Sequence, residues 1–294
     1  MNLNLNQDLL KQISEVLEDI VNHTSHKTRQ IAQNKLNLLN TNNQDFTSYL
    51  GFIFNSSKYS EESRILSLNL LNAKLNSMTI VTNVDYIKKV ALSSLQDPVV
   101  EEGAIKLILN LVKFQGITHW PDLISLLVSK KSSISSLFLL EQIVNISYNF
   151  LQVNEKENII KYCEENLNSK NLKIRELVIN MFISISNDLS EEKIKKILKI
   201  ILNFFNENKK EEFKDSNHHH SVHLSICHFI STILDNPNFI DVCLNFVDSI
   251  WDFLLFCTNH PNLELVQAAS ETWSLFVFEE DEEIVEKFKI ILKK

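Results

Sequence analysis

The sequence predicts an all-α fold, an α-α superhelix built of about seven stacked helical hairpins. Apolar residues recur at the helical period along nearly the whole chain, and no segment alternates as a strand does. Only three of the 294 residues are glycine, and the turns and bulges of a sheet would need more. Four prolines stand where helices should begin, because the first helical turn does not need the N–H that proline lacks.

The spacing of these prolines indicates repeats. Pro98 and Pro121 are 23 residues apart, and Pro237 and Pro261 are 24 apart. Pro98 and Pro261 are 163 residues apart, close to four steps of about 40 residues, the period of HEAT-type helix pairs. The prolines therefore mark half-repeats of a HEAT-repeat solenoid, an architecture that usually serves as a binding surface.

Taken in chain order, the apolar periodicity places each helix. The predicted hairpins pair 7–21 with 25–39, 45–55 with 60–76, 84–95 with 98–114, 121–129 with 133–151, 155–167 with 172–186, 190–206 with 221–234, and 239–258 with 262–278. Ser60 and Ser190 support two of the starts, since each precedes two acids that the helix dipole favours. Asp45 and Asp97 are natural N-caps. Residues 1–294 are expected to form one solenoid domain.

Two stretches depart from the hairpin pattern. Residues 207–220 are charged and lack periodicity, which predicts a surface loop inside the sixth hairpin. Residues 282–294 are expected to form an eighth first helix without its partner. The chain is therefore expected to be part of a longer protein.

Composition excludes several classes of function. Three scattered glycines allow neither a P-loop nor a G-x-G-x-x-G turn, which excludes most nucleotide-binding enzymes. A net charge of −8 with only three arginines disfavours nucleic-acid binding, including that of helical-repeat DNA glycosylases, and favours basic partners. The four cysteines lack C-x-x-C spacing and are interpreted as buried or idle thiols. No enzyme activity and no cofactor are expected.

Neither a secretory signal nor a membrane span is predicted. The most apolar stretch, 239–257, carries Asp241, Asn245, Asp248 and Asp252 at steps of 4, 3 and 4, which is one polar stripe on an amphipathic helix.

A histidine cluster raises the question of a metal site. His220, His223 and Cys227 would share a helix face, and zinc accepts that ligand set, but no fourth ligand is apparent. With His218 and His219 preceding them, a solvated loop is the favoured interpretation and no metal is expected.

The three tryptophans, Trp120, Trp251 and Trp273, are expected to anchor the core.

Three stretches resemble the amino-terminal arm of the karyopherin-β family, the importin-β and transportin nuclear transport receptors. Residues 64–72, Arg-Ile-Leu-Ser-Leu-Asn-Leu-Leu-Asn, are similar to the family's Arg-x-x-Ala/Ser-Gly-Leu-x-Leu-Lys-Asn. Residues 120–124, Trp-Pro-Asp-Leu-Ile, are similar to its Trp-Pro-Asp/Glu-Leu-Leu/Ile. Residues 269–273, Ala-Ser-Glu-Thr-Trp, followed by acids at 279–280, resemble its Glu-Phe-Trp helix. Motif order and separation fit transportin somewhat better, and the importin-β N-terminal-like region covers about 25–95.

The sequence departs from the family pattern at two positions. Leu68 stands where the family has glycine. Asn72 stands where the family has lysine, and the nearest lysine is Lys74.

The resemblance implies a function as well as a fold. It implies a nuclear transport receptor whose second helices line a concave wall that binds Ran-GTP. Its outer helices would bind phenylalanine-glycine (FG) repeats of nucleoporins, and its cargo would be proteins with basic nuclear localisation signals. Such a receptor is expected to be a monomer, free of membrane and nucleic acid, that moves between cytoplasm and nucleus through the pore complex.

Polar stripes on the second helices supply the Ran-binding candidates, since each set falls on one helix face. These candidates are Gln30, Asn34, Asn37, Asn69, Asn72, Asn76, Lys106, Asn110 and Lys113. A merely solvated face is the alternative.

Ile160 and Ile197 are the FG-nucleoporin candidates, with core packing as the alternative. For the chain as a whole, the alternative function is a HEAT-repeat scaffold or adaptor with unrelated protein partners.

Overall fold

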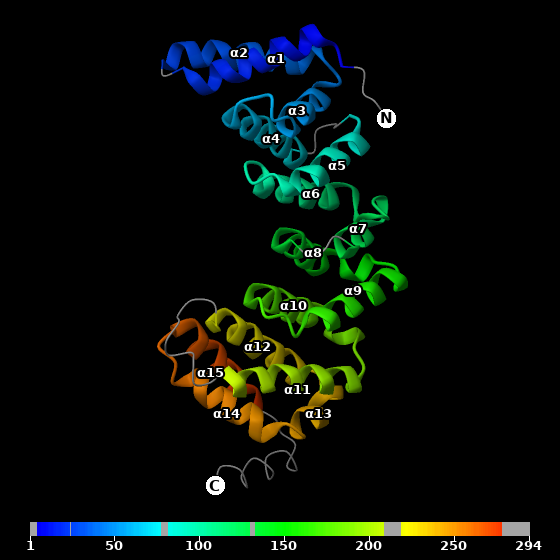
Figure 1. Cartoon of the computed structure of the whole chain (residues 1–294), viewed down its shortest axis with the longest axis vertical. Helices are drawn as coiled ribbons and strands as arrows, with labels where there is room; N and C mark the ends of the chain where they lie inside the picture. Colours follow the sequence, from blue (N-terminus) through cyan, green and yellow to red (C-terminus); the bar gives the residue numbers. More distant parts are fainter. Residues whose placement is uncertain (1–4, 24, 78–81, 130–132, 209–218, 278–294) are drawn as a thin grey trace. The chain divides into compact units, whose positions relative to one another are not determined.

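The computed structural model describes residues 5–23, 25–77, 82–129, 133–208 and 219–277. All regular secondary structure in these ranges is helical, which confirms the predicted all-α class (Figure 1). The chain divides into two compact units, Met1–Leu123 and Ile124–Lys294, and each is described by itself. The predicted loop at 207–220 falls largely outside the described residues, and the predicted helix at 282–294 does so entirely.

The first unit contains three helical hairpins. Their helices are α1 (Gln7–Asn22) with α2 (His26–Asn42), α3 (Phe46–Asn55) with α4 (Glu61–Asn76), and α5 (Val84–Ser93) with α6 (Glu101–Gln115). Within this unit α4 packs against α1, α3 and α6, and α3 also packs against α5. Helices therefore bury one side against their partner in the same hairpin, and α3 and α4 bury another side against the next hairpin.

The second unit repeats this arrangement. Its helices are α7 (Leu123–Ser129), α8 (Ile134–Ser147), α9 (Val153–Asn166), α10 (Leu172–Ile185), α11 (Glu191–Asn208), α12 (His219–Leu234), α13 (Ile240–Leu244), α14 (Val247–Thr258) and α15 (Leu263–Val277). The second helices α8, α10, α12 and α15 pack on one another in series. The predicted hairpins are confirmed to within a few residues at most of these boundaries.

Local sequence explains where the helices start. The side chain of Asn6 accepts hydrogen bonds from the backbone of Asp8 and Leu9, at 2.9 and 3.1 Å, and so caps α1. The hydroxyl of Ser60 caps α4 as predicted, through the backbone N–H of Ser63. The prolines are less regular than expected. Pro237 opens a 3₁₀ turn, whereas Pro98, Pro121 and Pro261 lie two or three residues before their helices.

The predicted helix 239–258 was wrong, because the structure divides it. A 3₁₀ turn (η5, Pro237–Phe239) leads into the short α13, and α14 begins only at Val247. The side-chain amide of Asn245 donates to the carbonyl of Asp241 at 2.8 Å, and the backbone of Phe246 donates to Cys243. A polar side chain that competes for a helical carbonyl in this way favours a helix end.

Polar side chains link equivalent helices of successive hairpins. The Asn55 side chain accepts from Ser93 and Ser94 at 2.8 and 2.9 Å, and these residues lie 38 and 39 positions away. In the second unit Ser231 and Thr272 are 2.7 Å apart and separated by 41 residues. These separations match the repeat period of about 40 residues that the prolines predicted.

The two buried arginines also form contacts between successive hairpins. Arg64 on α4 donates to the Phe54 carbonyl at 3.0 Å and forms an ion pair with Asp97, just before α6. Arg175 on α10 donates to the Ser169 carbonyl, and its guanidinium lies 3.9 Å from the ring centre of Phe204 on α11. Hydrogen bonds and an ion pair or ring contact offset the cost of burying a charge.

Gly103 explains how Leu68 is accommodated. A Cβ atom at Gly103 would lie 2.3 Å from Cδ2 of Leu68 and 2.9 Å from its Cγ, so α4 and α6 approach closely at this point. Leu68 stands where the resembled pattern has glycine. Gly103, on the next second helix, provides the space that this leucine needs.

A histidine occupies the core of the second unit. His223 on α12 is fully buried, and the rings of Phe205, Phe253 and Phe256 lie with their centres 5.9, 5.7 and 5.8 Å from its own. Burial, and then repulsion from other histidines, lower its pKa to about 3. His219 and His220 also belong to α12 and are half-buried, so the predicted solvated loop was wrong at these two positions.

We predict that Gly103→Ala lowers the free energy of unfolding by about 1–2 kcal/mol. Overpacking against Leu68 costs more than the gain in helix propensity, which is about 1 kcal/mol. In a Leu68→Ala background the same substitution should no longer destabilise. Denaturant unfolding of the four proteins in this double-mutant cycle measures the coupling, and additive effects would contradict the close contact.

We also predict that His223 makes the fold acid-sensitive. The unfolded chain binds a proton at this site below about pH 6.5, whereas the folded chain does so only near pH 3. Stability is therefore full well above pH 6.5 and falls as the pH drops, with a total loss of about 2 kcal/mol at pH 5.

The measurement is urea unfolding as a function of pH. His223→Leu should flatten the acid side of the profile, whereas His228→Leu, at an exposed histidine of the same helix, should leave it unchanged. An unaltered slope in His223→Leu would contradict the assignment.

Candidate functional site

The predicted polar stripe lies mostly on the surface of the first unit. Seven of the nine Ran-binding candidates are exposed, namely Gln30, Asn34, Asn37, Asn69, Asn76, Lys106 and Lys113. Lys106 forms a 2.6 Å ion pair with Glu102 one turn earlier, which is an exposed contact that leaves it accessible. The stripe is therefore available for a partner on all three second helices, α2, α4 and α6.

Asn72 and Asn110 have a structural use instead. The Asn110 amide donates to the Asn72 side-chain oxygen at 2.9 Å, and the Asn72 amide donates to the Gly103 carbonyl at 3.3 Å. Both residues are half-buried between α4 and α6. They hold these two helices together, so any effect on a partner acts through the position of the helices.

Helix α2 also exposes apolar residues, which the predicted polar stripe does not include. Ile31 and Leu38 are 60% and 64% exposed, and they lie on the same face as Lys27 and Asn34. Only Ala32 and Leu36 of this helix are buried. The signal was present in the sequence, since Ile31 and Leu38 are two helical turns apart. Paired apolar side chains among amides are typical of a protein-binding surface.

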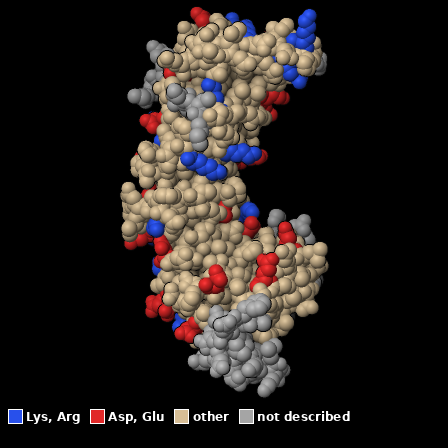
Figure 2. Space-filling view, turned by 180° about the vertical axis from the view of Figure 1, so that it is seen from behind, with Lys and Arg blue, Asp and Glu red and all other residues tan. Residues whose placement is uncertain are grey.

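Charge is distributed unevenly between the units. Residues 1–123 contain 11 Lys or Arg and 12 Asp or Glu, a net charge of −1. Residues 124–294 contain 18 and 25, a net charge of −7. On the face shown in Figure 2, acidic side chains are prominent over the second unit. The acidity of the whole chain therefore says little about the partner that the first unit favours.

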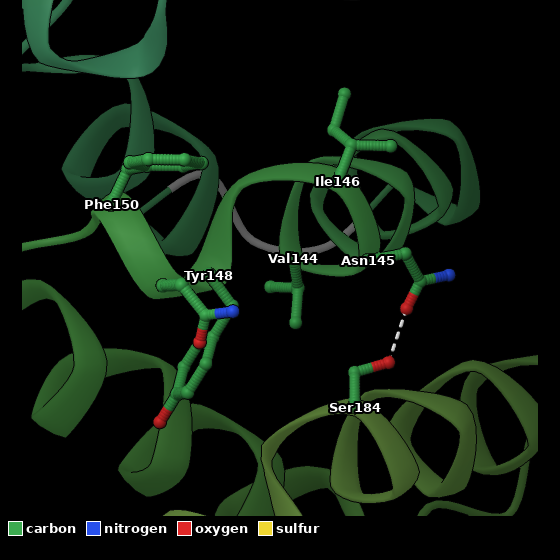
Figure 3. Close-up of a pocket in the computed structure, with 7 residues that line it drawn as sticks. Val144, Asn145, Ile146, Tyr148, Phe150 and Ser184 are labelled. Atoms are coloured by element: carbon green, nitrogen blue, oxygen red, sulfur yellow. Dashed lines mark hydrogen bonds between the residues drawn. The ribbon is translucent and has the colours of Figure 1, made fainter.

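An open pocket lies at the end of α8 in the second unit. Its volume is about 300 Å³, and it is lined by Val144, Asn145, Ile146, Tyr148, Asn149, Phe150 and Ser184. Figure 3 shows the side chains of Ile146 and Phe150 standing at its edge and the hydroxyl of Ser184 bonded to the oxygen of Asn145. Phe150, in the 3₁₀ turn η3 (Tyr148–Phe150), is 69% exposed. The pocket thus combines exposed apolar side chains with the amide of Asn149, whereas the Asn145 amide is already bonded to Ser184 and Glu141.

The two FG-nucleoporin candidates lie in the core. Ile160 on α9 and Ile197 on α11 are 8% and 2% exposed. The wide apolar arc of α11 is used for packing, since its buried residues contact α13 and α14. A partner could therefore touch these two side chains only if the helices parted.

The described residues also test the predictions for the cysteines, the tryptophans and the polar stripe within 239–257. All four cysteines are free and buried, as predicted. Trp120 is buried beneath Lys88, and the half-buried rings of Trp251 and Trp273 meet edge to face at 4.3 Å. The stripe from Asp241 to Asp252 is exposed as expected.

The described residues offer no cluster of three or more His, Cys, Asp or Glu side chains suited to a metal ion. Within those same residues no helix is long and apolar enough to cross a membrane.

Comparison with solved structures identifies the architecture, although no protein-family model and no curated sequence matches the chain. The Kap95:Nup1 complex matches with a TM-score of 0.66 and 16% identity. A structure of Kap95p, whose binding induces the switch loops of RanGDP to adopt the GTP-bound conformation, matches with 0.65 and 17%. Kap121p bound to Nup53p matches with 0.66 and 15%.

Each match covers 95% of this chain, and the chain spans 35%, 35% and 28% of the respective matched chains. At such low identity the likeness establishes the fold. The predicted likeness to karyopherins is thereby confirmed for the architecture, and the transportin-like subtype stays a prediction. The chain has the HEAT-repeat, α-α superhelical fold of the karyopherins Kap95 and Kap121.

Proposed function

We propose that the chain is part of a nuclear transport receptor that binds the GTPase Ran in its GTP form on α2, α4 and α6. The observation that carries this proposal is the likeness to Kap95 across 95% of the chain, together with the exposed polar stripe on the same unit's second helices. Kap95 is itself described acting on the switch loops of Ran.

The contact surface consists of the exposed amides and lysines of the stripe. Asn34 and Asn69 lie near the middle of α2 and α4, and Ile31 and Leu38 supply apolar anchors beside the amides. Such an arrangement, with few apolar anchors among hydrogen-bonding groups, is typical of transient protein interfaces. Asparagine stands at position 72, where the family has lysine. The positive charge of this surface is therefore supplied by Lys106 and Lys113 on the next second helix, α6.

The receptor works by linked binding equilibria and not by chemistry. Each hairpin contacts only its neighbours. A partner that prefers one curvature of the stack therefore changes how the remaining hairpins pack on one another. If GTP-bound Ran and cargo prefer different curvatures, each lowers the affinity of the other by the same factor. The cargo of the proposed receptor is a protein with a basic nuclear localisation signal.

We predict that the chain retains Ran loaded with GTP at least tenfold more strongly than Ran loaded with GDP. Asn34→Glu combined with Asn69→Glu should weaken the GTP complex at least tenfold, about 1.4 kcal/mol, because bulk and charge enter the middle of the interface. Biolayer interferometry with immobilised chain gives both affinities.

The matched control is Asn203→Glu, an exposed asparagine on α11. It should bind Ran as the unaltered chain does, and circular dichroism should show equal helicity in all variants. Equal retention of the two nucleotide forms, or none of either, would overturn the proposal and favour a HEAT-repeat scaffold with unrelated partners.

The nucleoporin partner is proposed at the pocket that ends α8. FG segments need an apolar pocket for phenylalanine and groups that bind the adjoining backbone. The exposed Ile146 and Phe150 supply the first, and the Asn149 amide supplies the second, since Asn145 and Ser184 are bonded to each other. The buried Ile160 and Ile197 do not line this pocket.

We predict that Phe150→Asp weakens binding of a fluorescent FG-repeat peptide at least fivefold in an anisotropy titration. A charge at the rim of an apolar pocket must lose water when phenylalanine enters. Leu263→Asp, at an equally exposed apolar residue of α15, is the matched control and should bind as before. Unchanged affinity in Phe150→Asp would remove the pocket from the proposal.

A further inference from the structure

A second pocket lies in the first unit, between the two second helices α2 and α4. Its volume is about 250 Å³. Its lining comes from α2, the start of α3 and the end of α4, with Ser77 just beyond, and consists of Leu36, Asn37, Asn40, Phe46, Leu70, Ala73, Lys74 and Ser77. No role has been given to this pocket so far.

The pocket has an apolar part and a cationic part. Leu36 and Phe46 are buried and form the apolar part together with Leu70. The ammonium of Lys74 lies 5.7 Å from the ring centre of Phe46. Partial burial lowers the pKa of Lys74, which shows that its ammonium has lost part of its hydration. A cation in that position gains more from an anion than a fully hydrated one does.

Two asparagines complete the polar side. Asn37 is exposed at the mouth of the pocket. The side-chain oxygen of Asn40 is buried and accepts no hydrogen bond from any residue that the structure describes. An unmet buried acceptor is costly, but a partner cannot reach this oxygen from outside. The exposed Asn37 amide is the group that can donate to a carboxylate attracted by Lys74.

Acids are scarce around the pocket: Asp45 precedes the lining residue Phe46 and accepts from the Asn83 amide at 3.2 Å, whereas α2 and the pocket-facing part of α4 carry none. Residues 25–44 and 63–77 contain five Lys or Arg and no Asp or Glu, in a chain with 37 acidic residues. The cations of these two segments are Lys27, Arg29, Lys35 and Lys74, together with Arg64, which is paired with Asp97. The local field therefore favours an anionic partner, opposite to the field of the whole chain.

The C-terminal ends of α2 and α4 repel an anion weakly through the helix dipole. A helix C-terminus carries roughly half an elementary negative charge, which is less than the full charge of Lys74. Several of the carbonyls concerned are already bonded. Thr41 and Asn43 donate to the carbonyls of Asn37 and Leu39, and Ser77 donates to that of Lys74. The positive charge of Lys74 therefore decides the sign of the site.

We propose that this pocket receives an acidic side chain of a protein partner, a glutamate flanked by leucine-sized apolar residues. The carboxylate meets the Lys74 ammonium and the Asn37 amide, and an apolar neighbour covers Phe46 and Leu70. The pocket shares Asn37 with the polar stripe, but the proposal does not depend on which protein binds that stripe.

The probe is the blocked tripeptide acetyl-Leu-Glu-Leu-amide, compared with acetyl-Leu-Gln-Leu-amide. Both are titrated into the ¹⁵N-labelled full chain, and the side-chain amide resonances of Asn37 and Asn40 are followed by NMR. The glutamate peptide should give saturable shifts with a millimolar dissociation constant, at least fivefold tighter than the glutamine peptide. Added salt should reduce that difference.

Two variants test the pocket without removing its fold. Lys74→Met keeps the stem over Phe46 and loses the charge, and Lys74→Arg restores the charge. Ala73→Phe, at an exposed position, fills the pocket and leaves Lys74 in place. Lys58→Met, at an exposed lysine outside the pocket, is the matched control.

We expect at least fivefold weaker binding in Lys74→Met and Ala73→Phe, recovery in Lys74→Arg, and no change in Lys58→Met. Equal shifts from the two peptides, unaltered binding in Lys74→Met, or no saturable shift at about 10 mM peptide would each overturn the proposal. A chain that binds the glutamate peptide but neither form of Ran would separate this site from the GTPase proposal.

Discussion

Packing between equivalent helices of successive hairpins is the constraint on which the rest of the structure depends. A single helix pair leaves an apolar face open, and stacking closes it. In the first unit α4 meets α6, and in the second α8, α10, α12 and α15 follow one another. Asparagine, serine and threonine side chains join these helices at separations of 38 to 41 residues. Each such bond satisfies polar groups that stacking would otherwise bury without a partner.

The same constraint determines which charges remain for a partner. Arg64 and Arg175, two of the three arginines, are buried at joints between hairpins. Lys88 is also buried, with its ammonium 2.8 Å from the His119 carbonyl and above Trp120. The cations that face solvent in the first unit are therefore mainly lysines, and those of α2 stand without acidic neighbours on their helix. Binding specificity in this unit depends on that local pattern and not on the net charge.

Much of the fold could be predicted, because helix boundaries depend on local chemistry. The limits of α4 followed from Ser60 and the apolar period, whereas Asp45 occupies the N-cap position of α3 without a side-chain capping hydrogen bond. The division at Asn245 could not be predicted, because an asparagine on an exposed helix face is equally compatible with a continuous helix. Seven of the nine polar candidates proved exposed, whereas Asn72 and Asn110 were bound between helices. Periodicity shows that a face is polar but not whether a neighbouring helix covers it.

The sequence by itself determined the all-α class, the repeat period, the positions of most helices and the burial of the cysteines. It did so because capping and amphipathic spacing act within a few residues of chain. Only the tertiary structure decided that Ile160 and Ile197 are core, that Gly103 makes room for Leu68, and that Lys74 lines a pocket with Asn37. Those outcomes join residues from different helices, and their distances follow from packing that no single segment encodes.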